Sequence, residues 1–315
     1  MAEIWTMGEA IVEIMRSSVD QPLDKAGTFL GPYPSGAPAI FIDTVARMGH
    51  SAGMISGVGD DDFGKNLLDR LEKDGVDCSL ILKNNKVSTG CAFVTYFKDG
   101  SRKFIFHIGN TPAAEAKAPD TSKMNDVKYF HIMGCSLMAS PVFGNEIVKT
   151  MRGLVKQGAK VSFDPNIRPE LLGDGECMKM VNEVMENTSV FMPGVQELLD
   201  ISGEKTVEDA VKKCFENPKL EVIALKNGSK GCKIFTRDEA ITFGIYPVEV
   251  KDATGAGDCF DGAFLCGLID GKSMIDCAKQ ATAAASLNTA AFGPMEGKIS
   301  IENVEKMIKE NPDVK

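Results

Sequence analysis

The sequence of 315 residues is poor in the side chains and spacings that build metal sites. It has only three histidines, His50, His107 and His131, and no two of them stand at helical spacing. Its nine cysteines are odd in number and irregularly spaced, and they include no Cys-x-x-Cys pair. These patterns argue against a structural zinc site and against a disulfide framework. We therefore expect buried, reduced thiols in a cytoplasmic protein.

The sequence also lacks a long hydrophobic run and an excess of basic residues. Its apolar stretch at 263–269 is far shorter than the roughly 18 residues that span a bilayer. Residues 1–5 lack the features of a signal peptide. Acidic residues outnumber basic ones by 44 to 35, which gives a net charge of −9. We therefore expect neither a membrane nor a nucleic acid as a partner, because phosphate backbones are bound by clustered Lys and Arg.

What the sequence does contain is an alternation of strand-like apolar runs and helical periods. Strands are predicted at 3–7, 52–58, 129–133, 160–163, 190–192 and 222–225. Residues 37–48 carry apolar side chains at helical spacing, and Gly49 stands where that helix should end. Such alternation predicts an α/β fold in which helices flank a central, mainly parallel, Rossmann-like sheet.

One stretch breaks this alternation. Residues 91–97 and 103–108 are β-rich runs joined by Lys98-Asp99-Gly100-Ser101, which is a hairpin signal, and another β-like run at 11–15 follows the first strand directly. These runs fit either an edge hairpin of the main sheet or a small antiparallel sheet beside it. We favour the second interpretation and expect a β lid, formed by about residues 10–35 and 87–112, on a single domain spanning 1–315.

Two glycine-rich loops are candidates for phosphate binding. The first, at 59–66, nearly matches G-x-x-x-x-G-K-[ST], but Asn66 lacks the hydroxyl group that would hold magnesium. Its three aspartates, 60–62, would also repel phosphates. Acidic residues suit the positively polarised start of a helix, and we interpret the loop in that way.

The second loop, 252–258, reads Asp-Ala-Thr-Gly-Ala-Gly-Asp and leads into an apolar helix. Its small residues let backbone N–H groups converge at the start of the helix, an arrangement that binds anions without a lysine. Asp258 would then accept the proton of a hydroxyl group that attacks a γ-phosphate. Taken alone, the loop fits equally well as a turn in which an aspartate caps a core helix.

The 252–258 motif resembles the signature of the ribokinase-like (PfkB) carbohydrate kinases, and the resemblance covers nearly the whole chain. Gly8-Glu9 closes the first strand as in family members, and 35–39 together with 57–64 resemble the N-terminal signature. Residues 164–169 resemble a stretch shared by fructokinases and 2-keto-3-deoxygluconate kinases, and 226–231 stand at the nucleotide loop. The resemblance implies a ribokinase-like fold and a sugar kinase that uses ATP and Mg²⁺ and forms a homodimer through its lid.

The resemblance also implies roles for individual residues. Asp258 is the catalytic base, and Gly255, Ala256 and Gly257 complete an anion hole with it. The implied substrate contacts are Glu13, Gly36, Ala37, His107, Arg168 and Asp258. The implied ATP contacts are Lys226, Gly228, Gly231, Gly255, Gly257 and Asn288. Glu197 is implied to position Mg²⁺ through water, and Asp252 and Thr254 match positions near a K⁺ site of some members.

Several departures from the family pattern bear on the substrate. Ile40 and Gly194 replace two usual asparagines, and Ile105-Phe106-His107 stands where sugar-acid kinases have Tyr-x-Arg. His107 is therefore either a substrate contact or a lid histidine without a ligand. A carboxylate substrate would need more charged partners than Arg168 alone, so we favour phosphorylation of a primary hydroxyl of a neutral ketohexose, similar to fructose or tagatose. The alternatives are a 2-keto-3-deoxygluconate kinase, a nucleoside kinase, and a non-catalytic sugar- or nucleotide-binding relative.

Overall fold

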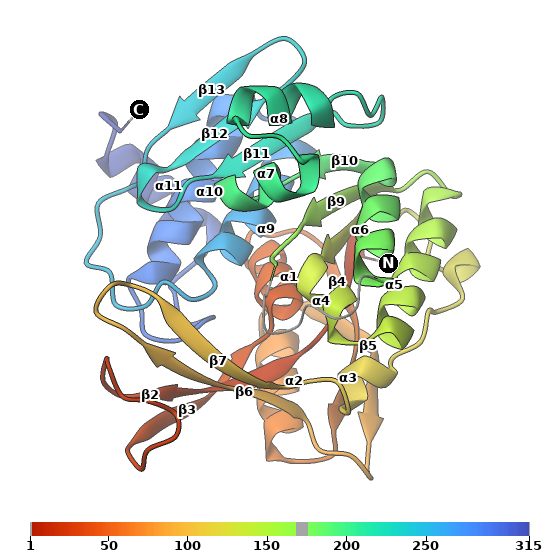
Figure 1. Ribbon diagram of the computed structural model, residues 1–315, viewed down its shortest axis with the longest axis vertical. Coiled ribbons are helices and arrows are strands. Elements are labelled where there is room, and N and C mark those ends of the chain that lie inside the picture. Colours follow the sequence, from red (N-terminus) through yellow and green to blue (C-terminus); the bar gives the residue numbers. More distant parts are fainter. Residues whose placement is uncertain (1, 168–175, 315) are drawn as a thin grey trace.

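The computed structural model describes residues 2–167 and 176–314. These residues form a nine-stranded sheet with the order β13-β12-β11-β10-β9-β8-β1-β4-β5 (Figure 1). Its strands are β1 (Ile4–Met7), β4 (Ala52–Gly59), β5 (Val76–Asn84), β8 (Tyr129–Met133), β9 (Lys160–Asp164), β10 (Thr188–Phe191), β11 (Val222–Lys226), β12 (Cys232–Phe235) and β13 (Ala240–Phe243). Neighbouring strands from β11 to β5 are parallel, whereas β12 and β13 are antiparallel. All six strands expected from the apolar runs lie in this sheet, which confirms the mainly parallel α/β fold.

Helices cover both faces of the sheet. One face carries α1 (Ala37–Arg47), α2 (Asp62–Lys73), α9 (Ala256–Ile269), α10 (Met274–Thr289) and α11 (Ile301–Glu310). The other carries α3 (Pro112–Glu115), α4 (Gly134–Ala139), α5 (Pro141–Val155), α6 (Glu176–Asn187), α7 (Val195–Ser202) and α8 (Val207–Cys214). Each set of helices encloses its own buried apolar cluster. Because strands covered on both faces are buried from two sides, their sequences are near-continuous apolar runs. Within the described residues, no helix combines the length and the apolar character that crossing a bilayer requires.

A second sheet of four strands, hereafter the small sheet, lies beside the main one, in the lower part of Figure 1. Its order is β3 (Phe29–Ser35), β2 (Ile11–Arg16), β6 (Gly90–Tyr96) and β7 (Arg102–His107). The expected separate sheet is thus confirmed, and β2–β3 and β6–β7 are antiparallel hairpins. The two hairpins meet through a parallel pairing of β2 with β6. This pairing arises because β2 and β6 follow β1 and β5, which run in the same direction in the main sheet.

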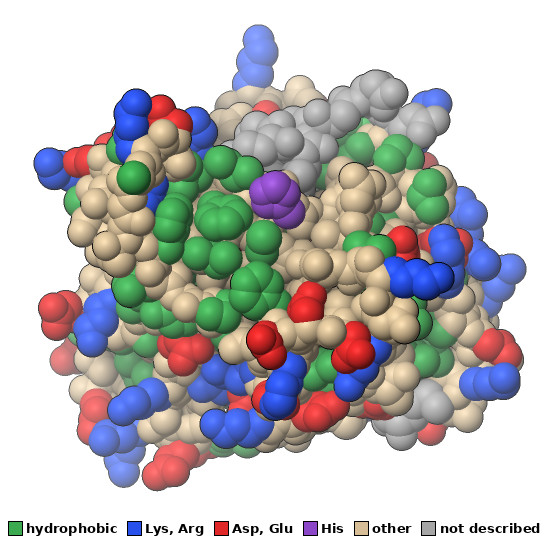
Figure 2. All heavy atoms as spheres, turned by 90° about the horizontal axis from the view of Figure 1, so that it is seen from below, with side chains coloured by type: hydrophobic (Ala, Val, Ile, Leu, Met, Phe, Trp, Pro, Cys, Tyr) green, Lys and Arg blue, Asp and Glu red, His purple; other side chains and the backbone are tan. Residues whose placement is uncertain are grey.

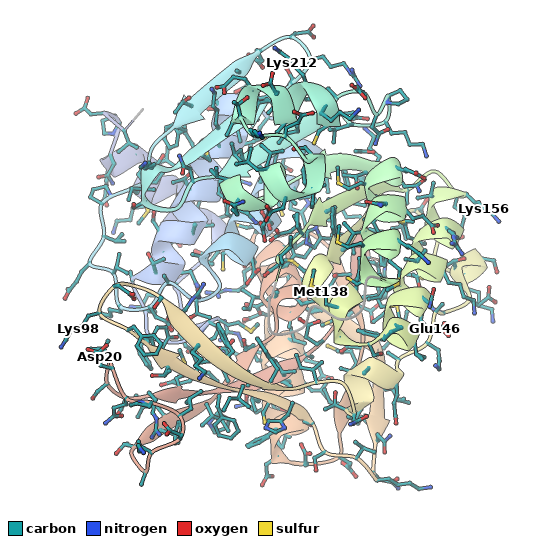
Figure 3. The ribbon with its side chains drawn as sticks, viewed as in Figure 1. Asp20, Lys98, Met138, Glu146, Lys156 and Lys212 are labelled. Carbon is teal, nitrogen blue, oxygen red and sulfur yellow. The ribbon has the colours of Figure 1, made fainter. Side chains whose placement is uncertain are left out.

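The tips of the two hairpins are tied together. Asp20 lies beyond the end of β2, and its carboxylate is 3.1 Å from the Nζ of Lys98 in the β6–β7 turn (Figure 3). The backbone N–H of Asp20 also donates to the carbonyl oxygen of Tyr96 at 2.8 Å. An exposed ion pair of this kind contributes little to stability. The backbone contact therefore fixes the relative position of the two tips.

Two further expectations concern cysteines and the first glycine-rich loop. All nine cysteines are free, seven of them buried, while Cys78 and Cys91 are partly buried. In the loop at 59–66, Asp61 caps α2, because its Oδ1 accepts a hydrogen bond from the N–H of Gly64 at 2.8 Å. The same oxygen accepts one from the hydroxyl group of Thr89 at 2.7 Å. The interpretation of this loop as a helix start is confirmed.

Candidate active site

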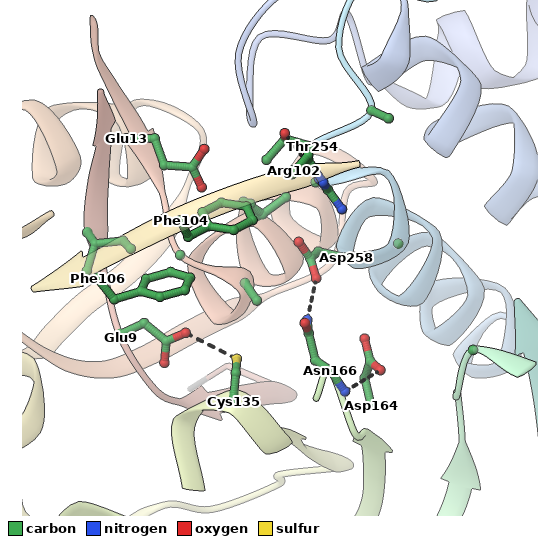
Figure 4. Close-up of a pocket in the computed structure, with 18 of the residues that line it drawn as sticks. Glu9, Glu13, Arg102, Phe104, Phe106, Cys135, Asp164, Asn166, Thr254 and Asp258 are labelled. Atoms are coloured by element: carbon green, nitrogen blue, oxygen red, sulfur yellow. Dashed lines mark hydrogen bonds between the residues drawn. The ribbon is translucent and has the colours of Figure 1, made fainter. Parts of the chain in front are cut away.

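A cavity of about 200 Å³ lies at the carboxyl ends of the parallel strands, beneath the small sheet (Figure 4). Glu9 follows β1, Cys135 follows β8, Asn166 follows β9 and Lys226 ends β11, and all four side chains line the cavity. The first turn of α9, with Asp258, forms another part of the wall. Open α/β sheets bind ligands at this edge because loops from several strands converge there.

Gly255 allows α9 to begin at the cavity wall. Its φ is +79°, and a Cβ atom at this position would lie 2.5 Å from the carbonyl oxygen of Pro294, so glycine is required. The buried side chain of Asn288 donates to the carbonyl oxygen of Thr254 at 2.8 Å and holds the preceding turn. The N–H groups at the start of α9 are therefore fixed at the cavity wall, where they favour an anion.

Asn166 donates a hydrogen bond to the carboxylate of Asp258. The Nδ2 of Asn166 lies 3.1 Å from Oδ1 of Asp258, and both residues are buried (Figure 4). Asn166 has φ of +41°, in the left-handed region that asparagine tolerates better than most residues. The Oδ1 of Asp164 accepts the backbone N–H of Asn166 at 3.1 Å and so holds this turn. The loop after β9 thereby orients the amide group that contacts Asp258.

Lys226 is held by two buried carboxylates. Its Nζ lies 2.7 Å from Asp164 Oδ2 and 2.9 Å from Asp261 Oδ2. Burial alone would lower the pKa of Lys226, but the two carboxylates outweigh it and raise that pKa. Burial alone would also raise the pKa of Asp164, but Lys226 outweighs this effect and lowers it. Lys226 thus joins β9, β11 and α9 below the cavity.

Glu13, on β2, places a buried carboxylate in the cavity wall. The hydroxyl group of Ser35 donates to Oε1 of Glu13 at 2.7 Å, while Oε2 has no hydrogen-bond partner among the described residues. Burial raises the pKa of Glu13 to about 7. A buried acceptor without a partner is costly, and hydroxyl groups of a bound ligand would satisfy it.

The two faces of β7 decide which residues of this strand meet the cavity. Arg102, Phe104, Phe106 and Ile108 line it, and these residues follow one another at a spacing of two. His107 lies on the other face, where its ring packs edge-to-face against Phe93 with centroids 6.1 Å apart. The structure therefore does not bring His107 to the cavity, because successive side chains of a strand point to opposite faces. Arg102, which the sequence analysis does not consider, places a cation in the cavity wall.

Glu197 fits a role in magnesium positioning. It lines the cavity, and its two carboxylate oxygens accept the backbone N–H groups of Ile167 and Gly194, each at 2.7 Å. Burial raises the pKa of Glu197. The described residues contain no group of three or more His, Cys, Asp or Glu side chains able to hold a metal ion. One carboxylate together with nucleotide phosphates is a ligand set that Mg²⁺ accepts, so the residues fit an ion that arrives with ATP.

The loop before α9 is tied to the small sheet. Tyr96 donates to Oδ1 of Asp252 at 3.0 Å and lies 2.9 Å from the hydroxyl oxygen of Thr254. The other oxygen of Asp252 accepts the N–H of Gly293 at 3.0 Å. The Nη1 of Arg102 donates to the Thr254 hydroxyl group at 3.2 Å. Asp252 and Thr254 therefore bind protein groups from β6 and β7.

The structure places the predicted site residues in three groups. Those that line the cavity are Glu13, Gly36, Ala37, Glu197, Lys226, Thr254, Gly255, Gly257 and Asp258. Ala256, Asp252 and Asn288 belong to, or hold, the turn at the start of α9. Gly228 and Gly231 lie in the turn between β11 and β12, where a Cβ atom on Gly231 would stand 2.0 Å from the carbonyl oxygen of Phe243. Arg168 lies outside the described residues.

A sequence profile of the pfkB family of carbohydrate kinases matches residues 1–300. The chain belongs to this family. Fructokinase-2 from Solanum lycopersicum is 30% identical over 278 residues, which cover 87% of this chain and 84% of that protein. The structure of an E. coli protein assigned as a ribokinase II, in complex with ATP and Mg²⁺, has a TM-score of 0.92 and 39% identity, and the match covers 98% of this chain and 100% of that one. A double-mutant Vibrio cholerae fructokinase, solved with fructose, ADP and a potassium ion, shares the fold with a TM-score of 0.82 at 22% identity, covering 98% of each chain.

Membership of the PfkB family confirms the prediction of an ATP-dependent carbohydrate kinase with a ribokinase-like fold. Side chains of the site that the sequence analysis missed include Glu9, Tyr96, Arg102 and Asn166. Glu9 was read as the end of a strand, yet its carboxylate accepts a hydrogen bond from the hydroxyl group of Ser136 at 2.6 Å. A signal for Arg102 is present in the sequence, because it directly precedes the predicted run at 103–108 and stands two residues before Phe104 and four before Phe106.

Proposed function

We propose that the protein transfers the γ-phosphoryl group of ATP to a primary hydroxyl group of a neutral ketohexose. The observation that carries this proposal is one cavity that holds both Asp258, at the start of α9, and the buried carboxylate of Glu13. Fructokinases from plants are among the similar proteins, which supports a ketohexose. The apolar surfaces of Ile40 and Phe104 leave fewer polar contacts than a sugar acid would need.

In the proposed reaction, each part of the cavity has one task. Glu13 accepts hydrogen bonds from hydroxyl groups of the sugar and orients the sugar. Gly36 and Ala37 lie beside the sugar. Asp258 accepts the proton of the attacking hydroxyl group, and Asn166 holds the carboxylate of Asp258 in place. The N–H groups of residues 255–258 stabilise the charge that develops on the transferred group. Mg²⁺, when bound with ATP, neutralises phosphate charge, and Glu197 would hold it.

Contacts of the nucleotide with Lys226, Gly228, Gly231 and Asn288 are part of the same proposal. The turn between β11 and β12 lies at the carboxyl edge of the main sheet, as a nucleotide loop requires. Lys226 supports this edge by joining β9, β11 and α9, since its Nζ is already bound by two carboxylates. For the loop before α9, we propose that K⁺ raises kcat by ordering Asp252 and Thr254. Replacing K⁺ by tetramethylammonium at constant ionic strength tests this effect.

We propose that the small sheet is a lid belonging to a single kinase domain, and that its outer face is a dimer interface. Figure 2 views the molecule from the side of the small sheet and shows apolar side chains gathered on this face. Phe93, which contacts His107, and its cross-strand partner Ile105, which is 44% exposed, do not line the cavity. A mixed apolar patch of this kind is typical of protein interfaces. Ile105→Glu should convert a dimer to a monomer in sedimentation velocity.

The experiment that tests the function is a screen of ATP consumption with fructose, tagatose, 2-keto-3-deoxygluconate and nucleosides. We expect the highest kcat/KM for a ketohexose, and a kcat lowered about 10²–10⁴-fold for Asp258→Asn. Arg102 favours the sugar acid as second candidate, because it adds a cation to the cavity. A hundredfold preference for the acid at both pH 6 and pH 8, roughly 3 kcal/mol of discrimination, would reverse this order.

A further inference from the structure

Arg102 makes no direct ion pair with a carboxylate within residues 2–167 and 176–314, although its charge acts at longer range on Glu13. It shares the cavity wall with Lys226, whose charge is bound by Asp164 and Asp261. Its guanidinium group points toward the start of α9 (Figure 4) and meets the neutral hydroxyl group of Thr254 at 3.2 Å. Resting on the proposed function, we propose that Arg102 is a catalytic residue that binds the phosphoryl group during its transfer from ATP to the sugar.

The position of Arg102 along β7 favours the phosphoryl group over the sugar. Side chains two residues apart on a strand lie about 7 Å from each other, so Arg102, Phe104 and Phe106 form a row across the cavity. The rings of Phe104 and Phe106 are stacked, with centroids 5.0 Å apart, and they cover the part of the cavity near Glu9 (Figure 4). Arg102 stands at the opposite end of this row, between Thr254 and Asp258 in the view of Figure 4. The rings of Phe104 and Phe106 therefore cover the part of the cavity proposed for the sugar, and the guanidinium group of Arg102 covers the start of α9.

The β6–β7 hairpin holds Arg102 in this place. Tyr96 and Arg102 are cross-strand partners at the end of the hairpin, and both contact Thr254. The hydroxyl group of Tyr96 also donates to Asp252, so the hairpin is anchored on both sides of residue 253. These contacts of Tyr96 and Arg102 connect the small sheet to the loop that precedes the anion hole. Arg102 reaches the start of α9 only when this link is formed.

Phosphoryl transfer is favoured by a cation at this position. In the transfer, the oxygen of the sugar hydroxyl group forms a bond to the γ-phosphorus while the bond from that phosphorus to the β–γ bridging oxygen breaks. ADP leaves with the electron pair of the broken bond, and the hydroxyl proton passes to the carboxylate of Asp258. Negative charge on the three oxygens of the moving group must be stabilised throughout. A guanidinium group offers two parallel N–H donors to such oxygens, which adds to the N–H groups at the start of α9.

Because the small sheet carries Arg102, this cation would also favour phosphorylation of the sugar over hydrolysis of ATP by water. When the sheet is away from α9, the phosphoryl group lacks Arg102 and is transferred slowly to water. A sugar that fills the space below Phe104 and Phe106 increases the population of the closed position, in which Arg102 meets the phosphoryl group. The enzyme thereby links its full catalytic power to the presence of the acceptor.

The test compares Arg102→Ala and Arg102→Lys with Lys103→Ala. Lys103 is the exposed neighbour on the outer face of β7 and serves as the control for loss of one lid charge. We expect Arg102→Ala to lower kcat by about 10³-fold, the scale of other arginines that stabilise phosphoryl transfer, with KM for the sugar nearly unchanged. Arg102→Lys should retain part of the activity, and Lys103→Ala nearly all of it. Guanidinium at a non-denaturing concentration should restore part of kcat to Arg102→Ala but not to Asp258→Asn.

A second measurement does not depend on which sugar is the substrate. ADP with Mg²⁺ and aluminium fluoride imitates the phosphoryl group in transfer, and its binding is followed by calorimetry. Arg102→Ala should weaken this binding at least about tenfold and leave the binding of ADP alone unchanged. If the wild type phosphorylates no ketohexose but this difference is found, the proposed substrate fails and the role of Arg102 stands. Unchanged aluminium fluoride binding, or a loss limited to KM for a sugar acid, would overturn the role of Arg102.

Discussion

Glu13→Gln replaces a buried carboxylate by a neutral amide of nearly the same size. Burial raises the pKa of Glu13 from 4.5 to about 7, with the Ser35 hydroxyl group giving partial compensation. The folded protein therefore binds the Glu13 proton more tightly than the unfolded chain does. As the pH rises from about 4.5 to about 7, the unfolded chain loses this proton first, and the free energy of unfolding falls. A difference of about 2.5 pKa units corresponds to about 3 kcal/mol, fully developed above pH 7.

The assay is urea unfolding of the wild type and of Glu13→Gln across pH. We expect the variant to gain about 2 kcal/mol in free energy of unfolding relative to the wild type between about pH 5.5 and pH 8. Glu302→Gln, on the exposed side of α11, is the matched control and should give a difference that stays flat with pH. A difference for Glu13→Gln that is equally flat would refute the reasoning. The same variant should raise KM for the sugar about 10- to 100-fold, because a charged acceptor is lost.

Three other substitutions probe the start of α9 and the loops around it. Asp258→Asn should lower kcat by about 10²–10⁴-fold with near-native urea unfolding, as expected for loss of a general base; near wild-type kcat in a folded variant would contradict that role. Asn166→Gly keeps the backbone at φ of +41° but removes the donor to Asp258, and kcat should fall about 10- to 100-fold while the thermal midpoint changes little. An unchanged kcat would show that this hydrogen bond does not serve the reaction. Lys226→Met leaves Asp164 and Asp261 buried without their cation and should cost about 3–5 kcal/mol in the free energy of unfolding. A loss below about 1 kcal/mol, the value of a surface ion pair, would show that these buried contacts do not stabilise the fold.

The sequence predicted the fold well because its main signals are local. Buried parallel strands are continuous apolar runs, and each of the six predicted ones has its counterpart in the main sheet. β5, β12 and β13 went unpredicted. In β5, Val76 and Ile81 are buried while most of the remaining residues are partly or fully exposed, which is the pattern of an edge strand rather than an apolar run.

The sequence predicted the site less well than the fold, because the contacts in the site join residues that are far apart in the sequence. The match to the family motif identified Asp258 and Gly255, but no local pattern indicates that Asn166, from another strand, donates to Asp258. His107 was chosen by its place in a family motif rather than by strand parity, and parity puts it on the outer face. The family resemblance implies that Lys226 belongs to a nucleotide loop. It does not indicate that Lys226 also forms an ion pair with the buried Asp261, one turn after Asp258.

The parallel pairing of β2 with β6 has a consequence for the order of folding. A hairpin forms from neighbours in sequence, but β2 and β6 are separated by β3, α1, β4, α2 and β5. They can pair only after β1, β4 and β5 have aligned in the main sheet, since those strands set their directions. The small sheet should therefore be the last part to form and the first to open, and its backbone amides should exchange with solvent through openings that leave the nine-stranded sheet intact. Opening of the small sheet over the cavity would then follow from the order of the strands along the chain, and either hairpin transplanted alone into another protein would lack it.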